Sequence, residues 1–114
     1  MQNFPQRGEI YLVRIPNKPK DSKERPALIV SMDVRNQYAD DVIAIPLTTN
    51  LRAAPTHIRI KKGLGGLKQD SMAKCEQITT LDKSLLIRGP FAGKISESLL
   101  SDILKAILNA LGAY

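Results

Sequence analysis

The sequence has few of the residues on which metal, disulfide and histidine chemistry usually depend. Its 114 residues include one cysteine, Cys75, one histidine, His57, and no tryptophan. A single cysteine rules out an internal disulfide, and we find no His, Cys, Asp and Glu cluster at the spacing of metal ligands. We therefore expect no metal site and no cofactor.

Long apolar segments are also missing. No run is long enough to cross a membrane, and the N-terminus lacks the basic and then apolar layout of a signal peptide. Because the chain also has only one cysteine, a reducing compartment suits it best. These features together predict a cytoplasmic protein.

The composition otherwise predicts one ordinary globular domain over residues 1–114, with 43% hydrophobic and 25% charged residues. Seventeen Lys and Arg against eleven Asp and Glu give a net charge of +6 and a pI of about 9.7. This excess favours an anionic partner such as nucleic acid or an acidic protein, although an inert basic surface fits it equally well.

Most of the chain predicts short strands. Runs rich in β-branched residues occur at residues 9–15, 26–31, 42–47, 56–60, 70–78 and 85–94. The run at 26–31 is almost continuously apolar, which indicates burial on both faces, while Pro46 suggests an edge strand or a bulge. Residues 33–41 are expected to be a loop, and the glycines within 61–69 predict a turn with positive φ.

The last segment changes to a helical period. Ser96 is a plausible N-cap, Gly112 a plausible stop, and apolar residues recur between them at the spacing of one helix face. A helix of about fifteen residues is marginal alone in water, so it must pack on the sheet. The predicted fold class is mainly β, a small curved antiparallel sheet closed by a C-terminal helix.

Four short patterns, in this order, resemble the MazF/PemK family of toxin endoribonucleases. They are Arg7-Gly8-Glu9-Ile10-Tyr11, Arg25-Pro26, Pro46-Leu47-Thr48-Thr49 and Glu76-Gln77-Ile78. The resemblance runs from Arg7 to about Leu108. It implies a CcdB/MazF/PemK-like, SH3-like barrel of five to seven strands, in a homodimer that cuts RNA and binds an acidic antitoxin.

RNA cleavage suits a chain with these residues, because RNA carries its own nucleophile, the 2′-hydroxyl. An enzyme need only orient the attack, move protons and stabilise charge on the phosphate. By the resemblance, Arg25 and Thr48 fall on the catalytic arginine and threonine of the family. The structural alternatives are a salt bridge from Arg25 to Asp21 or Glu24, and a capping role for the Thr48 hydroxyl.

A second catalytic candidate is the pair Lys74 and Glu76, which would share one face of a strand over residues 70–78. An exposed salt bridge between them is the simpler reading. His57, in mid-strand and without an obvious partner, is expected to be structural. Further residues are expected to contact RNA: Lys18, Lys20, Ser22, Lys23, Thr49, Gln77 and Thr79.

The chain departs from the family pattern in a charged rather than glycine-rich loop before Arg25, and in Thr79, where many members carry Arg or Lys. The leading hypothesis is a metal-independent endoribonuclease that acts on single-stranded RNA as the toxin of a toxin–antitoxin pair. The alternatives are a non-catalytic toxin of similar fold that binds DNA gyrase, and a passive RNA-binding module. Scattered aromatic residues argue against the last.

Overall fold

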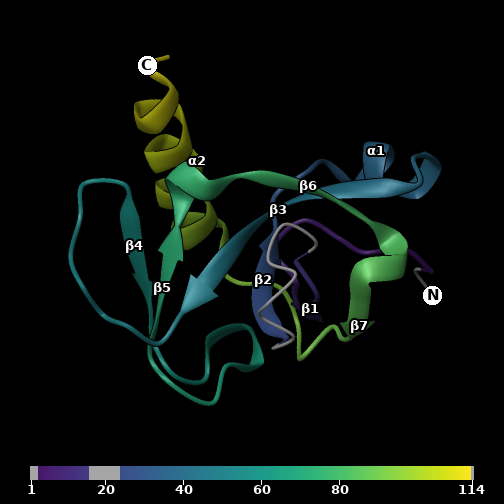
Figure 1. The fold of residues 1–114 in the computed structure, drawn as a ribbon, viewed down its shortest axis with the longest axis horizontal. Coiled ribbons are helices and arrows are strands. Elements are labelled where there is room, and N and C mark those ends of the chain that lie inside the picture. Colours follow the sequence, from purple (N-terminus) through teal and green to yellow (C-terminus); the bar gives the residue numbers. More distant parts are fainter. Residues whose placement is uncertain (1–2, 16–23, 114) are drawn as a thin grey trace.

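The computed structural model describes residues 3–15 and 24–113 and contains seven strands and two α-helices (Figure 1). The strands are β1 (Ile10–Val13), β2 (Arg25–Ile29), β3 (Asp41–Thr48), β4 (His57–Ile60), β5 (Ser71–Lys74), β6 (Thr79–Asp82) and β7 (Leu86–Arg88). The helices are α1 (Asp33–Tyr38) and α2 (Glu97–Leu111). Short 3₁₀ turns occupy Leu64–Gly66 (η1), Cys75–Gln77 (η2) and Lys83–Leu85 (η3).

All pairings in the sheet are antiparallel, and the order is β4-β5-β3-β2-β1-β7, with β6 paired to β3. The predicted fold class, a curved antiparallel sheet with a C-terminal helix, is confirmed. The long strand β3 pairs with three neighbours, β2, β5 and β6. It is therefore a central strand, so the first of the two alternatives drawn from Pro46, an edge strand, is wrong.

Pro46 is accommodated by the change of partner along β3. On one side β3 pairs with β2 through Pro46 itself. On the other side it pairs with β6 as far as Ala44 and with β5 from Leu47 onward. Pro46 lies between these two pairings, where the missing N–H of a proline is least costly.

The sheet is buried on both faces. One core cluster contains Ile10, Leu28, Ile45 and Leu47 and is covered by α2, whose Ile103, Ala106 and Ile107 are buried against it. The second cluster, on the opposite face, is formed by other residues of β1, β2 and β3 together with one residue of β6. Its members are Val13, Ala27, Ile29, Val42, Ala44 and Leu81. Burial on both faces of residues 26–31 is thus confirmed.

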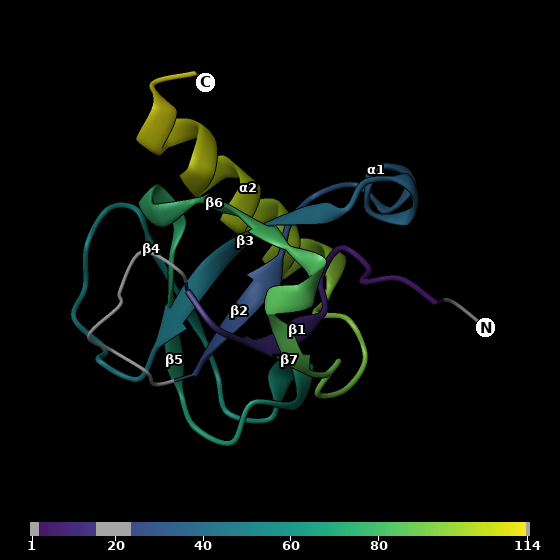
Figure 2. The ribbon, with the colours of Figure 1, turned by 45° about the vertical axis from the view of Figure 1, so that its right-hand side comes forward.

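Helix α2 runs behind the sheet in the view of Figure 2, with η2 and β4 among its contacts. Its limits agree with the predicted caps. The Ser96 side chain accepts a hydrogen bond from Leu99 N–H at 3.2 Å, and Gly112 adopts a left-handed conformation with φ of 72°. Among the helices of the described residues, none is long and apolar enough to cross a bilayer.

Three local predictions differ from the structure. Residues 33–38 form α1 rather than a loop, because Asn36 is fully buried and hydrogen-bonds to Ser31. Strand β5 ends at Lys74, and the chain then turns through η2 before β6, so residues 70–78 are not one strand. In the last predicted strand only Leu86–Arg88 is extended. The glycine turn at 61–69 is confirmed, with positive φ at Gly63, Gly65 and Gly66.

Candidate active site

Arg25 and Thr48 lie at the same end of two paired strands, β2 and β3. Arg25 begins β2 and Thr48 ends β3, and the two strands pair with Ala27 opposite Pro46. Continuing this register by two residues sets Arg25 opposite Thr48. Directly opposed residues of an antiparallel pair project from the same face, with Cβ atoms about 4.5–5.5 Å apart. Both residues are half-buried, at the rim of the sheet rather than in its core.

The same face continues across two more strands. Thr48 is opposite Met72, and Met72 and Lys74 are opposite Arg59 and His57. Because side chains alternate along a strand, these residues lie on one side of the sheet, away from α2. We call this side the basic face, defined by Arg25, Thr48, Met72, Lys74, His57 and Arg59. Ile58 and Ile60 pack against the core, while His57 and Arg59 lie on the opposite side of β4.

Thr48 also has a structural role. Its Oγ1 accepts a hydrogen bond from the backbone N–H of Asn50 at 3.1 Å, which is the capping role considered as an alternative. A hydroxyl that accepts one bond still has a proton to donate. The turn therefore fixes the position of the oxygen without preventing its hydrogen from reaching a phosphate. Of the two partners considered for Arg25, Glu24 pairs with Arg14 at 3.6 Å, and Asp21 lies outside the described residues.

Glu76 does not lie beside Lys74 on a strand, because β5 has ended and Glu76 is in η2. Both of its carboxylate oxygens have partners: Oε1 accepts from the Thr56 hydroxyl at 2.8 Å, and Oε2 is 3.2 Å from His57 Nε2. Partial burial raises the pKa of Glu76, but hydrogen bonds from its own backbone, Thr56 and His57 outweigh this and lower it. A carboxylate held in this way is a poor general base.

His57 therefore has a partner that the sequence did not reveal. Its second ring nitrogen, Nδ1, lies 3.3 Å from the backbone oxygen of Arg52, so the ring connects the loop after Thr48 with η2. On the basic face Arg59 also pairs with Asp70, at 2.6 Å. The signal for both residues is the alternation of residues 57–60, which places His57 and Arg59 on the side opposite the core side chains.

We expect Glu76→Gln to lower the free energy of unfolding by about 1 kcal/mol or less at pH 7, because the Glu76 carboxylate is exposed to solvent. The folded-state pKa of Glu76 is lowered, so the stabilisation is present above the pKa of the unfolded chain and is lost as pH falls through the folded value. Urea unfolding at pH 7 and near pH 3 measures the difference. The control is Asp102→Asn on the exposed side of α2, and an equal pH dependence in both variants would contradict the expectation.

The remaining predicted residues are distributed unevenly. Gln77 is exposed at the end of η2, and Thr49 is exposed just after Thr48. Thr79 is opposite Ala44. Ala44 precedes Thr48 by four residues along β3, so Thr79 lies about 13 Å along the strand from Thr48. Lys18, Lys20, Ser22 and Lys23 lie outside the described residues.

The described residues contain no grouped metal ligands, and their one cysteine is buried. Over residues 3–15 and 24–113, no three His, Cys, Asp or Glu side chains are grouped so that they could hold a metal ion. Cys75 is fully buried, and burial followed by the nearby charge of Glu76 raises the pKa of its thiol to about 11. A thiol of this kind stays protonated and unreactive.

The protein is thus a small antiparallel β-protein with a C-terminal helix, and its basic face carries Arg25 and Thr48 at one rim of the sheet. The family model for the PemK-like, MazF-like toxin of type II toxin–antitoxin systems matches residues 6–111. The endoribonuclease MazF of Staphylococcus saprophyticus is 37% identical over 86 residues, covering 70% of each protein. The chain therefore belongs to this toxin family, and it is an endoribonuclease of the MazF type.

Solved structures agree with this assignment. A mycobacterial endoribonuclease in complex with its cognate antitoxin has a TM-score of 0.80 and 29% identity, over 96% of this chain and 97% of that one. The MazE–MazF complex of Deinococcus radiodurans also gives a TM-score of 0.80, over 99% and 100% of the two chains. Its identity is 18%, so this second likeness supports the fold alone.

Proposed function

We propose that this endoribonuclease cuts single-stranded RNA without a metal ion, by attack of the 2′-hydroxyl on the adjacent phosphate at Arg25 and Thr48. The observation that supports the proposal is the register of β2 and β3, which sets Arg25 opposite Thr48 on the basic face when it is continued two residues beyond Ala27 and Pro46. The other two functions considered from the sequence, gyrase binding and passive RNA binding, gain no support from relatives that are named endoribonucleases.

In the proposed reaction the 2′-oxygen forms a bond to phosphorus while the bond from phosphorus to the 5′-oxygen breaks. The proton lost by the 2′-hydroxyl is balanced by one gained at the leaving 5′-oxygen. The Arg25 guanidinium is suited to the non-bridging oxygens, because its planar fork of donors matches their geometry and its charge opposes theirs. The Thr48 hydroxyl would donate to the same phosphate and fix its orientation.

This mechanism predicts cleavage in the presence of EDTA, with products that end in a 2′,3′-cyclic phosphate and begin with a 5′-hydroxyl. The reason is that the nucleophile belongs to the substrate, so no metal-bound water is needed. Mass spectrometry of the fragments from a short RNA would identify both ends. Loss of activity in EDTA that returns with Mg²⁺, or a linear 3′-hydroxyl product, would contradict the mechanism.

We also propose a homodimer that is inhibited by an acidic antitoxin. The net charge of +6 attracts an acidic segment to the surface that would hold RNA. Large apolar side chains are also exposed on the helices, and they suit contact with another chain. They are Met32 just before α1, Val34 and Tyr38 on α1, and Leu108 and Leu111 on α2.

We expect a two-fold dimer at micromolar concentration and competition between the antitoxin's acidic segment and RNA. Light scattering measures the mass, and RNA cleavage measured against increasing antitoxin peptide tests the competition. Because the attraction is partly electrostatic, inhibition should weaken as salt increases. A monomer, or a peptide that binds while cleavage continues unchanged, would contradict this part of the proposal.

A further inference from the structure

A pocket lies at the same rim of the sheet as Arg25 and Thr48 but on the other side of β2. Its volume is about 500 Å³, and its walls come from β1, β2, the loop before β5 and the segment after β7. Pro26 lines it together with Leu12, the residue opposite Pro26 on β1. Because neighbouring residues of a strand project from opposite faces, Pro26 faces the pocket while Arg25 belongs to the basic face. We call this cavity the rim pocket.

The rim pocket has apolar walls and a polar opening. Leu12, Pro26, Leu67 and Phe91 supply the apolar surface. The approach of the loop to Phe91 depends on Gly66, where a Cβ would lie 2.8 Å from the Phe91 Cβ. The pocket volume is within the range of about 300–1,000 Å³ that small-molecule sites have.

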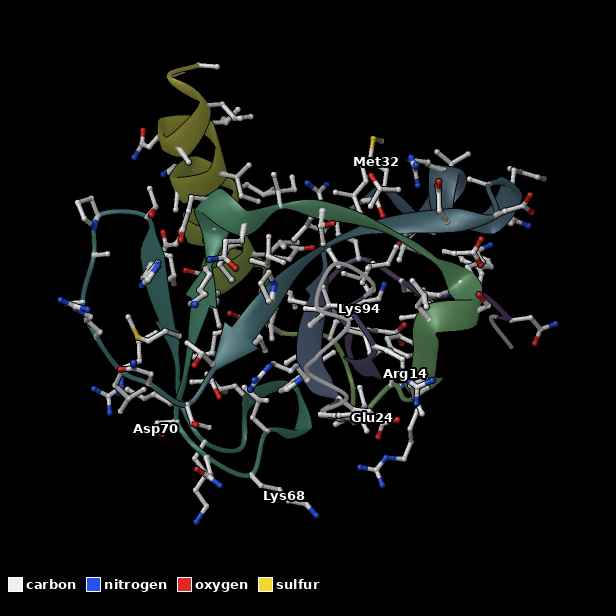
Figure 3. The ribbon with its side chains drawn as sticks, viewed as in Figure 1. Arg14, Glu24, Met32, Lys68, Asp70 and Lys94 are labelled. Carbon is white, nitrogen blue, oxygen red and sulfur yellow. The ribbon has the colours of Figure 1, made fainter. Side chains whose placement is uncertain are left out.

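The opening of the pocket is cationic. Lys68, Gln69 and Arg88 line it, and the Arg88 guanidinium carbon lies 6.0 Å from the centre of the Phe91 ring. Among the described residues neither Lys68 nor Arg88 forms a salt bridge. Figure 3 shows Lys68 at the lower end of the molecule. Apolar and planar surfaces beside unpaired cations and an amide are the features with which proteins hold an unstacked base and its phosphate.

We propose that the rim pocket binds one nucleobase of the RNA strand whose phosphate is cut at Arg25 and Thr48. This inference rests on the proposed function. Arg25 and Pro26 are consecutive, as are Thr48 and Thr49, and in each pair the second residue lines the pocket. An RNA strand that crosses this rim can therefore place a phosphate on the basic face and a nearby base in the pocket. Gln69, whose amide both donates and accepts, is assigned to the edge of that base.

The test is a scan of abasic positions. A short RNA with a 2′-deoxynucleotide at the scissile position, and one abasic nucleotide placed at each other position in turn, is titrated against the protein by fluorescence anisotropy. The variants are Gln69→Ala and Arg88→Ala, and the control is Lys105→Ala, which removes a charge from the exposed side of α2. Thermal unfolding checks that each variant is folded.

We expect one abasic position to weaken binding to the wild type roughly five- to 150-fold, the range for loss of one stacked base. In Arg88→Ala and Gln69→Ala the same abasic position should cost much less, because the base has already lost its partner. Lys105→Ala should behave as the wild type. Equal abasic penalties in the wild type and both rim-pocket variants would overturn the proposal.

The two proposals fail in different ways. If the wild type cuts the all-ribose RNA but no abasic penalty depends on the rim pocket, only the rim-pocket inference is overturned. If a penalty depends on the pocket but the all-ribose RNA is not cut, the cleavage mechanism fails and the pocket assignment stands. An effect of Gln69→Ala and Arg88→Ala on binding of an acidic antitoxin peptide alone would assign the pocket to the protein partner and overturn the inference.

Discussion

An RNA that carries a single 2′-deoxynucleotide at the scissile position is expected to bind normally and remain uncut. The missing hydroxyl is the proposed nucleophile, so its removal abolishes the reaction rather than slowing it. Binding should change little, since the phosphates and bases that contact the protein are all still present. The deoxy substitution placed one nucleotide to either side should leave cleavage intact.

The measurement compares cleavage and binding of the same three oligonucleotides. Electrophoresis of end-labelled RNA gives the cleavage rates, and anisotropy gives the dissociation constants. Cleavage of the scissile-deoxy substrate at a rate comparable to that of the RNA would show that water, rather than the 2′-hydroxyl, attacks the phosphate. In that case the assignment of Arg25 and Thr48 to a metal-free transfer would have to be abandoned.

Arg25→Ala should reduce the rate of the chemical step by about 10²- to 10³-fold, the usual cost of removing one donor that faces developing charge. The charge on the phosphate grows toward the transition state, so kcat should fall more than affinity. Arg25→Lys should recover part of the rate, because it restores the charge without the planar fork. Lys105→Ala, which also removes one positive charge but lies on α2, is the matched control.

Thr48→Ala should cost less than Arg25→Ala if its hydroxyl mainly orients the phosphate. The double variant shows whether the two residues act on the same transition state, since the effects of independent residues add. Neither change should unfold the chain, because both positions lie at the rim. Near wild-type cleavage by a folded Arg25→Ala protein would remove Arg25 from the reaction and direct attention to Lys74.

Much of the fold could be predicted because the signals are local. The period of α2, its Ser96 cap and the alternation at residues 56–60 depend on neighbouring residues only. The apolar run at 26–31 likewise indicated burial on both faces. That Arg25 and Thr48 come to the same rim could not be read from the sequence, since it depends on the register between β2 and β3. There the family resemblance, rather than residue spacing, suggested that the two act together.

The errors came from side-chain contacts that the local pattern does not show. Asn36 was read as a loop residue, but its buried amide donates to the backbone oxygen of Ser31 at 2.9 Å and stabilises a short helix whose Val34 and Tyr38 are exposed. Glu76 was placed on a strand because residues 70–76 alternate, yet its carboxylate is held by Thr56 and His57, some twenty residues earlier. A polar side chain with a remote partner overrides the local pattern, and no periodicity reveals that partner.

The threefold pairing of β3 has a consequence for how such an enzyme can acquire new RNA targets. Thr48 is the last residue of the strand with the most neighbours, so the position of its hydroxyl is determined by the framework of the sheet. The loop after Thr48 and the turn at residues 61–70 lie outside the strands of that framework. Substitutions, insertions or exchanges in these segments can therefore change which RNA is recognised while the bond-breaking pair stays in register. The same arrangement makes the two segments the natural targets for directed evolution of cleavage specificity.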